Sequence, residues 1–241
     1  MYTPIENEIF HIHTYRCTHA SNESEHLYVK KAIELGASRI VFTDHGPYMS
    51  DQFTERMRYS ELEDYLDTIW ELKDQYADKI EIICGLELEY IPGFDDYYRQ
   101  LKAMPKMELL ILGQHFCQLD DGTYSFEAKD KSFEFISLFK AMEQGIDSGY
   151  FDVIAHPDRM LRRRTSFGDK EREASISFIN KVIQAKDRLY IERNIASMER
   201  EHQYWREFWD LVPADIKVLD GLDAHSVADV ERRWRLQRQP L

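Results

Sequence analysis

The strongest constraint on the fold of this chain is the alternation of apolar, β-rich runs with helical stretches along all of its 241 residues. The expected strands cover residues 8–13, 39–43, 80–84, 109–113, 151–155, 188–193 and 216–220. The expected helices cover residues 24–35, 60–76, 132–147, 170–186 and 197–210. This alternation predicts an α/β fold with a parallel sheet. No linker-like segment interrupts it, so we expect a single domain over residues 1–241.

The positions of the polar residues distinguish between an open sheet and a barrel. Histidines or acidic residues follow six of the seven expected strands. An open doubly wound sheet gathers its ligands at one switch point, whereas a barrel brings the carboxyl end of every strand to one face. We therefore expect a seven-stranded (β/α)7 barrel.

Charge and composition limit the classes of partner. The formal charge of −13 disfavours contact with the phosphates of long nucleic acid or with anionic lipid. Three cysteines, an odd number without a C-x-x-C motif, indicate a reduced and hence cytoplasmic protein. No signal peptide is expected, and no stretch approaches the roughly 18 apolar residues of a membrane span. The oligomeric state stays open.

Seven of the nine histidines stand at the ends of the apolar runs, and acidic residues lie beside them. His11 and His13 are two residues apart on an expected strand, so their side chains should share one face. Asp223 and His225 repeat that spacing. Imidazole and carboxylate are common ligands of divalent metals. The seven histidines are His11, His13, His19, His45, His115, His156 and His225.

Acidic residues complete the candidate site. Glu87 and Glu89 lie on the same side of one extended segment, and Glu87, nearer the strand end, is the preferred ligand. For Asp158 we favour an orienting or helix-capping role. His26 and His202 fall in expected helices, where they should be solvated or packing residues.

The number of candidate ligands exceeds the need of one or two metals. Three divalent ions fit if Glu87 bridges two of them, and zinc, manganese and iron all accept this mixture. Such a pocket would be strongly positive and would suit a small anionic substrate. A metal-bridging hydroxide could attack phosphorus in line, which predicts phosphate-ester hydrolysis.

The ordered pattern from about residue 9 to residue 226 resembles the PHP (polymerase and histidinol phosphatase) superfamily. Its members form a distorted seven-stranded barrel, with the active site at the C-terminal ends of the strands, and carry three metals. The resemblance implies one cation at His11, His13, Glu87 and Asp223, a second at Glu87, His115 and His156, and a third at His19, His45 and His225. Within the superfamily, four segments resemble the histidinol-phosphate phosphatases: RCTHA (16–20), FTDHGP (42–47), MRYSELEDY (57–65) and GLELEYIPG (85–93).

Catalytic and substrate-binding roles follow as expectations. Glu87, Asp223 and Asp44 are the candidate catalytic carboxylates, and either Asp44 or a metal-bound water could protonate the leaving group. Guanidinium groups suit a phosphate because they bind two of its oxygens at once. The candidates for that contact are Arg159, Arg162 and Arg193.

The leading functional hypothesis is a metal-dependent phosphomonoesterase, with L-histidinol phosphate as the first candidate substrate. A phosphodiesterase acting on a short oligonucleotide or nucleoside bisphosphate is the main alternative, because the same metals permit that reaction. An amidohydrolase, whose barrel also begins with H-x-H, fits the pattern less well. A module that binds metal or a partner without catalysis represents a different class.

Overall fold

The computed structural model describes residues 2–238, which contain seven parallel strands in one sheet with the order β1-β2-β3-β4-β5-β6-β7. The strands are β1 (Glu8–Ile12), β2 (Arg39–His45), β3 (Glu81–Leu88), β4 (Leu109–Leu112), β5 (Val153–Ile154), β6 (Tyr190–Asn194) and β7 (Val218–Gly221). Backbone hydrogen bonds also join the segment after β7 to β1, with Leu222 N donating to Phe10 O at 2.8 Å. The pairing order therefore returns to its first strand. The predicted α/β class and seven-stranded barrel order are confirmed.

Helices follow most of the strands. They are α1 (Glu25–Glu34), α2 (Leu62–Gln75), α3 (Asp95–Ala103), α4 (Glu134–Ser148), α5 (Asp169–Ala185), α6 (Ile195–Met198), α7 (Arg206–Trp209) and α8 (Val227–Gln237). Three 3-10 turns, η1 (Tyr15–Cys17), η2 (Tyr59–Glu61) and η3 (Pro157–Leu161), lie between them. None of the helices among residues 2–238 is both long enough and apolar enough to cross a membrane.

Two helix predictions need correction. The expected helix over 197–210 is instead the two short helices α6 and α7, because the carboxylate of Asp158 accepts the Trp205 amide proton and Trp205 is extended (φ −120°, ψ 100°). The helix expected over residues 60–76 is present but begins at Leu62, after η2, and the carboxylate of Glu61 accepts a hydrogen bond from Arg58 N at 2.8 Å. The prediction omitted α3 and α8.

The contacts divide the chain into two compact units. Unit 1 comprises Leu88–Leu101 and Ile111–Leu219 together with Met1, which lies outside the described residues. Unit 2 comprises Tyr2–Glu87, Lys102–Leu110 and Asp220–Leu241. The expectation of one domain over 1–241 stays a prediction.

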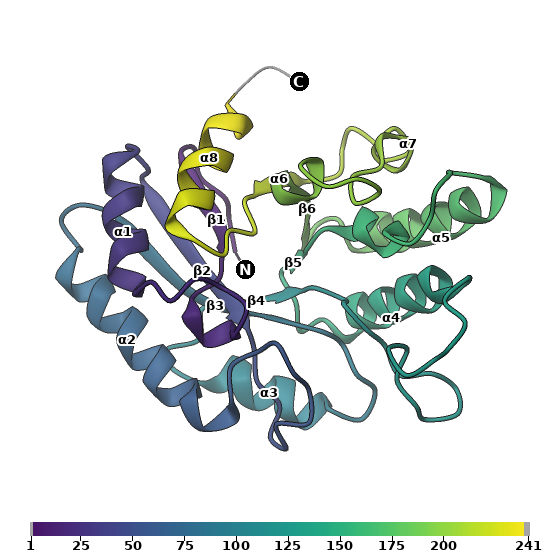
Figure 1. Cartoon of the computed structure of the whole chain (residues 1–241), viewed down its shortest axis with the longest axis horizontal. Helices are drawn as coiled ribbons and strands as arrows, with labels where there is room; N and C mark the ends of the chain where they lie inside the picture. Colours follow the sequence, from purple (N-terminus) through teal and green to yellow (C-terminus); the bar gives the residue numbers. More distant parts are fainter. Residues whose placement is uncertain (1, 239–241) are drawn as a thin grey trace. The chain divides into compact units, whose positions relative to one another are not determined.

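Unit 2 contains β1, β2 and nearly all of β3, with α1, α2 and α8 beside them (Figure 1). The apolar faces of α1 and α2 are buried, including Tyr28, Tyr65 and Ile69. The Tyr65 hydroxyl donates to the carbonyl of Gly85 at 2.8 Å and so ties α2 to β3. The helices of unit 2 bury its apolar side chains, and the polar side chains of the candidate site lie at the C-terminal ends of the strands.

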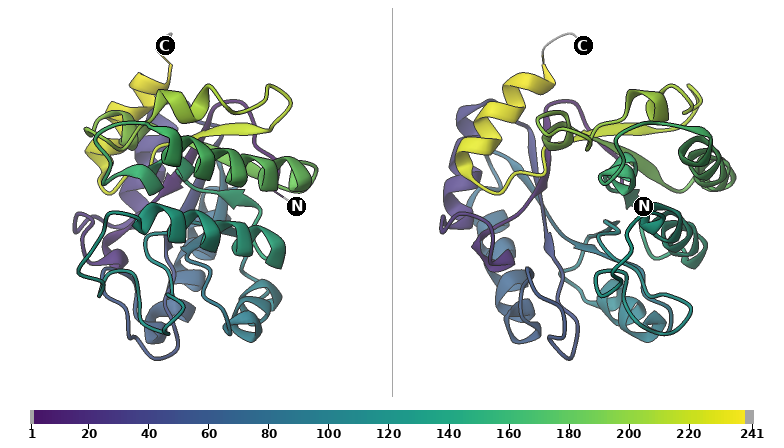
Figure 2. Two further views of the ribbon diagram at one scale, coloured as in Figure 1. Left: turned by 90° about the vertical axis from the view of Figure 1, so that its right-hand side faces the viewer. Right: turned by 45° about the vertical axis from the view of Figure 1, so that its right-hand side comes forward.

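In unit 1, α4 and α5 run side by side (Figure 2). Phe139 of α4, Phe178 of α5 and Phe208 of α7 form one buried cluster, with ring centroids 5.4–6.2 Å apart. The burial of these large rings stabilises the helices. Asp158 of η3 adds a polar anchor, because its Oδ2 accepts from both Trp205 N and Trp209 Nε1 at 3.0 Å.

Candidate metal centre and active site

Seven of the predicted ligands lie together in unit 2, at the C-terminal ends of its strands. They are His11, His13, His19, His45, Glu87, Asp223 and His225. His11 and His13 are fully buried, whereas His19 is exposed. The cluster therefore extends from the interior of unit 2 to its surface.

His13 occupies the centre of the cluster. Its Nε2 lies 3.3 Å from Asp223 Oδ1 and 3.5 Å from Glu87 Oε2. Its ring centroid lies 4.9 Å from that of His11 and 4.4 Å from that of His45. His11, His13 and Asp223 each offer a ligand atom, all within 4.8 Å of one another, and so do His13, His45 and Glu87.

A second group lies at the more exposed end of the cluster. His19, His45 and His225 offer three ring nitrogens within 4.8 Å of one another. The Nε2 atoms of His19 and His225 are 2.8 Å apart. This is the trio that the family resemblance assigned to one cation.

The backbone that presents these side chains departs from a regular strand. The pairing of β1 with β2 shifts between Ile9 and Ile12, and His11 has φ 69°. The rings of His11 and His13 are close, as expected, but simple strand alternation is not the reason, because the irregularity of β1 lies at His11 itself. The backbone of Asp223 also has a left-handed conformation, with φ 48°. Arg233 of α8 donates a hydrogen bond to the Asp223 carbonyl at 2.6 Å.

The electrostatics of the cluster favour neutral imidazoles. Burial, followed by the nearby ring of His45, lowers the pKa of His13 to about 3. Burial, followed by His13, also lowers the pKa of His225 to about 3. A neutral imidazole has a lone pair for a metal. Among the described residues, the Nδ1 atom of His13 has no hydrogen-bond partner, and buried polar atoms normally have one. These donors fit divalent cations.

Asp44 supports the segment that carries the ligand cluster. Its carboxylate accepts from Thr14 N at 2.7 Å and from Thr14 Oγ1 at 2.9 Å. Burial raises the pKa of Asp44 to about 7, although both Thr14 contacts act in the opposite direction. Asp44 therefore fixes the residue that follows His13.

Unit 1 contains the other two predicted ligands. The ring centroids of His115 and His156 are 5.2 Å apart. His115 Nδ1 lies 3.0 Å from Glu89 Oε1, and Glu89 is buried. The sequence ranked Glu89 below Glu87 as a ligand, and the structure gives it a separate partner.

His156 lies at the end of β5 in an unusual conformation, with φ 33°, and its amide donates to Glu192 Oε2 at 2.9 Å. The same carboxylate oxygen accepts from Asn194 Nδ2 at 3.2 Å. Glu192 and Asn194 are fully buried on one face of β6. The sequence alone did not connect Glu192 or Asn194 with His156.

The three candidate arginines have different surroundings within unit 1. Arg159 is buried, and its guanidinium donates to Asn194 Oδ1 at 3.1 Å and to Ser197 Oγ at 3.2 Å. Arg162 Nη2 donates to the carbonyl of His115 at 2.9 Å. Arg193 is partly exposed and, by strand alternation, lies on the opposite face of β6 from Asn194.

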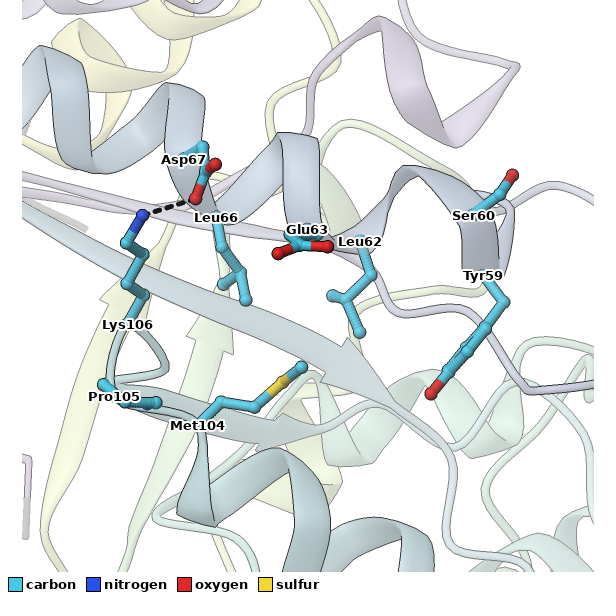
Figure 3. A pocket seen from close by; sticks show the side chains of 9 residues that line it. All are labelled: Tyr59, Ser60, Leu62, Glu63, Leu66, Asp67, Met104, Pro105 and Lys106. Carbon is cyan, nitrogen blue, oxygen red and sulfur yellow. Dashed lines mark hydrogen bonds and ion pairs between the residues drawn. The ribbon is translucent and has the colours of Figure 1, made fainter.

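A groove on α2 and the two remaining histidines, His26 and His202, lie outside the predicted site. A groove on α2 has an apolar floor that includes Leu62, Leu66 and Met104, and an Asp67–Lys106 ion pair lies at its edge (Figure 3). His26 of α1 lies 3.1 Å from the Tyr76 hydroxyl, as expected for a packing residue. His202 stacks on Trp205 in a turn rather than in the predicted helix.

Comparison with protein families matches residues 10–196 to the PHP domain. This match covers more than half of the chain, which therefore belongs to the PHP domain family. The predicted resemblance to that superfamily, and within it to histidinol-phosphate phosphatases, is confirmed.

Two curated relatives are similar over different lengths. The histidinol-phosphatase of Bacillus subtilis is 31% identical over 153 residues, which are 59% of this chain and 57% of the relative. The match thus spans less than two thirds of that relative. A protein of Deinococcus radiodurans named "Probable histidinol-phosphatase" is 26% identical over 235 residues, covering 93% of this chain and 88% of the relative.

A solved structure shares the fold. It is the histidinol phosphate phosphatase of Lactococcus lactis, crystallised with zinc, L-histidinol and phosphate. The TM-score is 0.69 with 16% sequence identity, and the match covers 96% of this chain and 92% of the other. At this identity, the likeness concerns the fold alone.

Proposed function

We propose that this protein is a divalent-metal-dependent phosphomonoesterase and that L-histidinol phosphate is its substrate. The observation that carries the proposal is the convergence of His11, His13, His45, Glu87 and Asp223, with ligand atoms within 4.8 Å of one another in overlapping trios. We take the substrate from the names of the two curated relatives. The zinc, L-histidinol and phosphate bound in the Lactococcus lactis structure agree with a metal-dependent reaction and with that substrate.

The clustered histidines and carboxylates of unit 2 would hold the cations. We propose that His11, His13, Glu87 and Asp223 hold one and that His19, His45 and His225 hold another. The proposal that His115 and His156, with Glu87, hold a third rests on the ordered nine-residue pattern of the family. Bound cations would supply Lewis-acid activation of water and charge neutralisation at the phosphate. Zinc, manganese and iron all fit these donors.

The chain itself would prepare the ligands and confine the water. Burial keeps His13 neutral, so its lone pair needs no deprotonation near neutral pH. Glu87 and Asp223 place carboxylate charge against the same ring, and we propose them as the catalytic carboxylates together with Asp44. The raised pKa of Asp44, about 7, would let it carry a proton near neutral pH.

Arg159 and Arg162 are the proposed phosphate-binding residues. Hydrogen bonds to Asn194 Oδ1 and Ser197 Oγ orient the guanidinium of Arg159. The Nη1 atom of Arg162 is buried and has no hydrogen-bond partner among residues 2–238. An anion would satisfy that donor. Arg193 stays a weaker candidate because it lies on the other face of β6 from Asn194.

The test compares kcat/KM of zinc- or manganese-reconstituted protein for L-histidinol phosphate, p-nitrophenyl phosphate and bis(p-nitrophenyl) phosphate. We expect the highest value for L-histidinol phosphate and little turnover of the diester. Chelation should abolish activity. His13→Ala should lower kcat/KM at least about 100-fold, because it removes a central ligand. His26→Ala, a histidine of α1 outside the cluster, is the matched control and should stay within about twofold.

Three outcomes would contradict the proposal. Faster turnover of the diester would replace the monoesterase by a phosphodiesterase. Stoichiometric metal binding without hydrolysis of any ester would indicate a binding module. Activity that persists in chelated His13→Ala protein would exclude the metal-dependent reaction.

A further inference from the structure

His115 is held at its ring and at its backbone by residues that are not themselves predicted ligands. At the ring, Glu89 Oε1 lies 3.0 Å from Nδ1, and the Glu89 side chain is 1% exposed. At the backbone, Arg162 Nη2 donates to the His115 carbonyl at 2.9 Å. His115 is therefore fixed from both sides.

The segments that carry Glu89 and His115 are joined by the side chain of Gln114, which is fully buried. Its Oε1 accepts from Tyr90 N at 3.0 Å, and its Nε2 donates to Tyr90 O at 3.2 Å and to Phe116 O at 2.6 Å. One amide thus connects the residue after Glu89 with the residue after His115. This bridge sets the separation of the carboxylate and the ring.

The backbone of Glu89 is also anchored. The Tyr98 hydroxyl of α3 donates to the Glu89 carbonyl at 2.8 Å and accepts from Ile91 N at 2.9 Å. Tyr98 is fully buried. Because Glu89 is fixed at its backbone and buried at its side chain, its carboxylate has little freedom to leave His115.

This arrangement selects one tautomer of His115. A carboxylate beside Nδ1 accepts a hydrogen bond from the N–H of that nitrogen, so in the neutral ring the proton stays on Nδ1 and the lone pair resides on Nε2. We propose that Glu89, supported by Gln114, is the positioning residue that makes Nε2 of His115 a metal ligand. The inference rests on the metal-binding role of His115 in the proposed function. Carboxylates that orient ligating histidines commonly strengthen metal binding about 10- to 100-fold.

The first measurement is the tautomer itself, from long-range 1H–15N NMR correlations of the full-length, zinc-loaded and zinc-free protein. His115→Gln identifies the ring signals. We expect the ring proton of wild-type His115 on Nδ1 in both states. In Glu89→Leu the zinc-free ring should populate both tautomers, whereas Glu89→Gln should keep part of the Nδ1–H population because its amide oxygen still accepts a hydrogen bond.

The second measurement is the metal retained per chain after dialysis against graded chelator. Glu89→Leu should lose one cation at about 10- to 100-fold lower chelator strength than the wild type, and Glu89→Gln should lie between them. Glu143→Gln is the control, because Glu143 of α4 bonds Ser177 instead. Circular dichroism and the Tm check that each variant folds, and Glu89→Gln keeps the test valid if Glu89→Leu does not.

The outcomes separate this inference from the proposed function. Unchanged tautomer and metal retention in both Glu89 variants, with normal phosphatase activity in the wild type, would overturn the positioning role alone. Unchanged metal content in His115→Gln would overturn it as well. A tautomer and metal content that depend on Glu89 in a protein without phosphatase activity would support the positioning role while refuting the proposed function.

Discussion

At the scale of single residues, the candidate metal cluster of unit 2 depends on buried polar groups that have specific hydrogen-bond partners. Asp44 is fully buried, and its carboxylate accepts two hydrogen bonds from Thr14, which follows His13 directly. A buried carboxylate that loses a donor carries an uncompensated desolvation cost. The hydrogen bond from the Thr14 hydroxyl to Asp44 should therefore contribute measurably to the free energy of unfolding.

Thr14→Val tests this contribution. Valine preserves the branched shape but removes the donor to Asp44 Oδ2, so we expect the free energy of unfolding to fall by about 1–3 kcal/mol. Urea unfolding monitored by circular dichroism measures the change. Thr54→Val, at an exposed threonine, is the control and should change it by less than about 0.5 kcal/mol. Equal midpoints for Thr14→Val and the wild type would show that the hydroxyl is dispensable.

At the scale of elements, the register between strands determines which site residues meet. β2 and β3 pair without a shift, so His45 stands opposite Glu87, and their Nδ1 and Oε2 atoms are 3.1 Å apart. β3 continues to Leu88, beyond the predicted end at residue 84. Gly85 lies inside it, where a Cβ atom would meet the carbonyl oxygen of Leu109 at 2.8 Å. The close approach of the two backbones explains a glycine within a strand.

Gly85→Ala should therefore act on both the strand and the site. We expect a loss of about 1–3 kcal/mol in the free energy of unfolding from overpacking, together with weaker metal retention because Glu87 is two residues away. Gly149→Ala is the control. That position has φ 72° and open space around it, so only the backbone cost of about 1 kcal/mol applies and metal content should not change. Equal effects of the two substitutions would contradict the steric explanation.

At the scale of the whole molecule, charge discriminates between small and large phosphate esters. The net charge of −13 repels polyanions. We expect no measurable binding of a fluorescent 20-nucleotide single strand in fluorescence anisotropy at physiological ionic strength, and no inhibition of L-histidinol phosphate hydrolysis by the unlabelled strand. Inorganic phosphate serves as the small-anion control and should compete. Tight binding of the strand would instead favour the nucleic-acid alternative.

The sequence by itself predicted the α/β class, the seven strands, the four helices α1, α2, α4 and α5 among the eight of residues 2–238, and the identity of the candidate ligands. These features are local: periodicity identifies α1, α2, α4 and α5, and a histidine at the end of an apolar run is visible without its neighbours. The order and spacing of the candidate ligands along the chain indicated the PHP family. The sequence also singled out Glu89, but gave no reason to connect it with a residue 26 positions away.

Only the tertiary structure decided the partners. It pairs Glu89 with His115, holds Trp205 out of a helix through Asp158, puts a bulge at His11 and separates Arg193 from the Arg159–Asn194 contact. Each of these outcomes depends on atoms far apart in the chain, where hydrogen bonding of buried groups outweighs local propensity. Helix and strand propensity and residue spacing are local properties that can be read from the sequence. The burial that determines which donor a carboxylate pairs with exists only after the chain has folded.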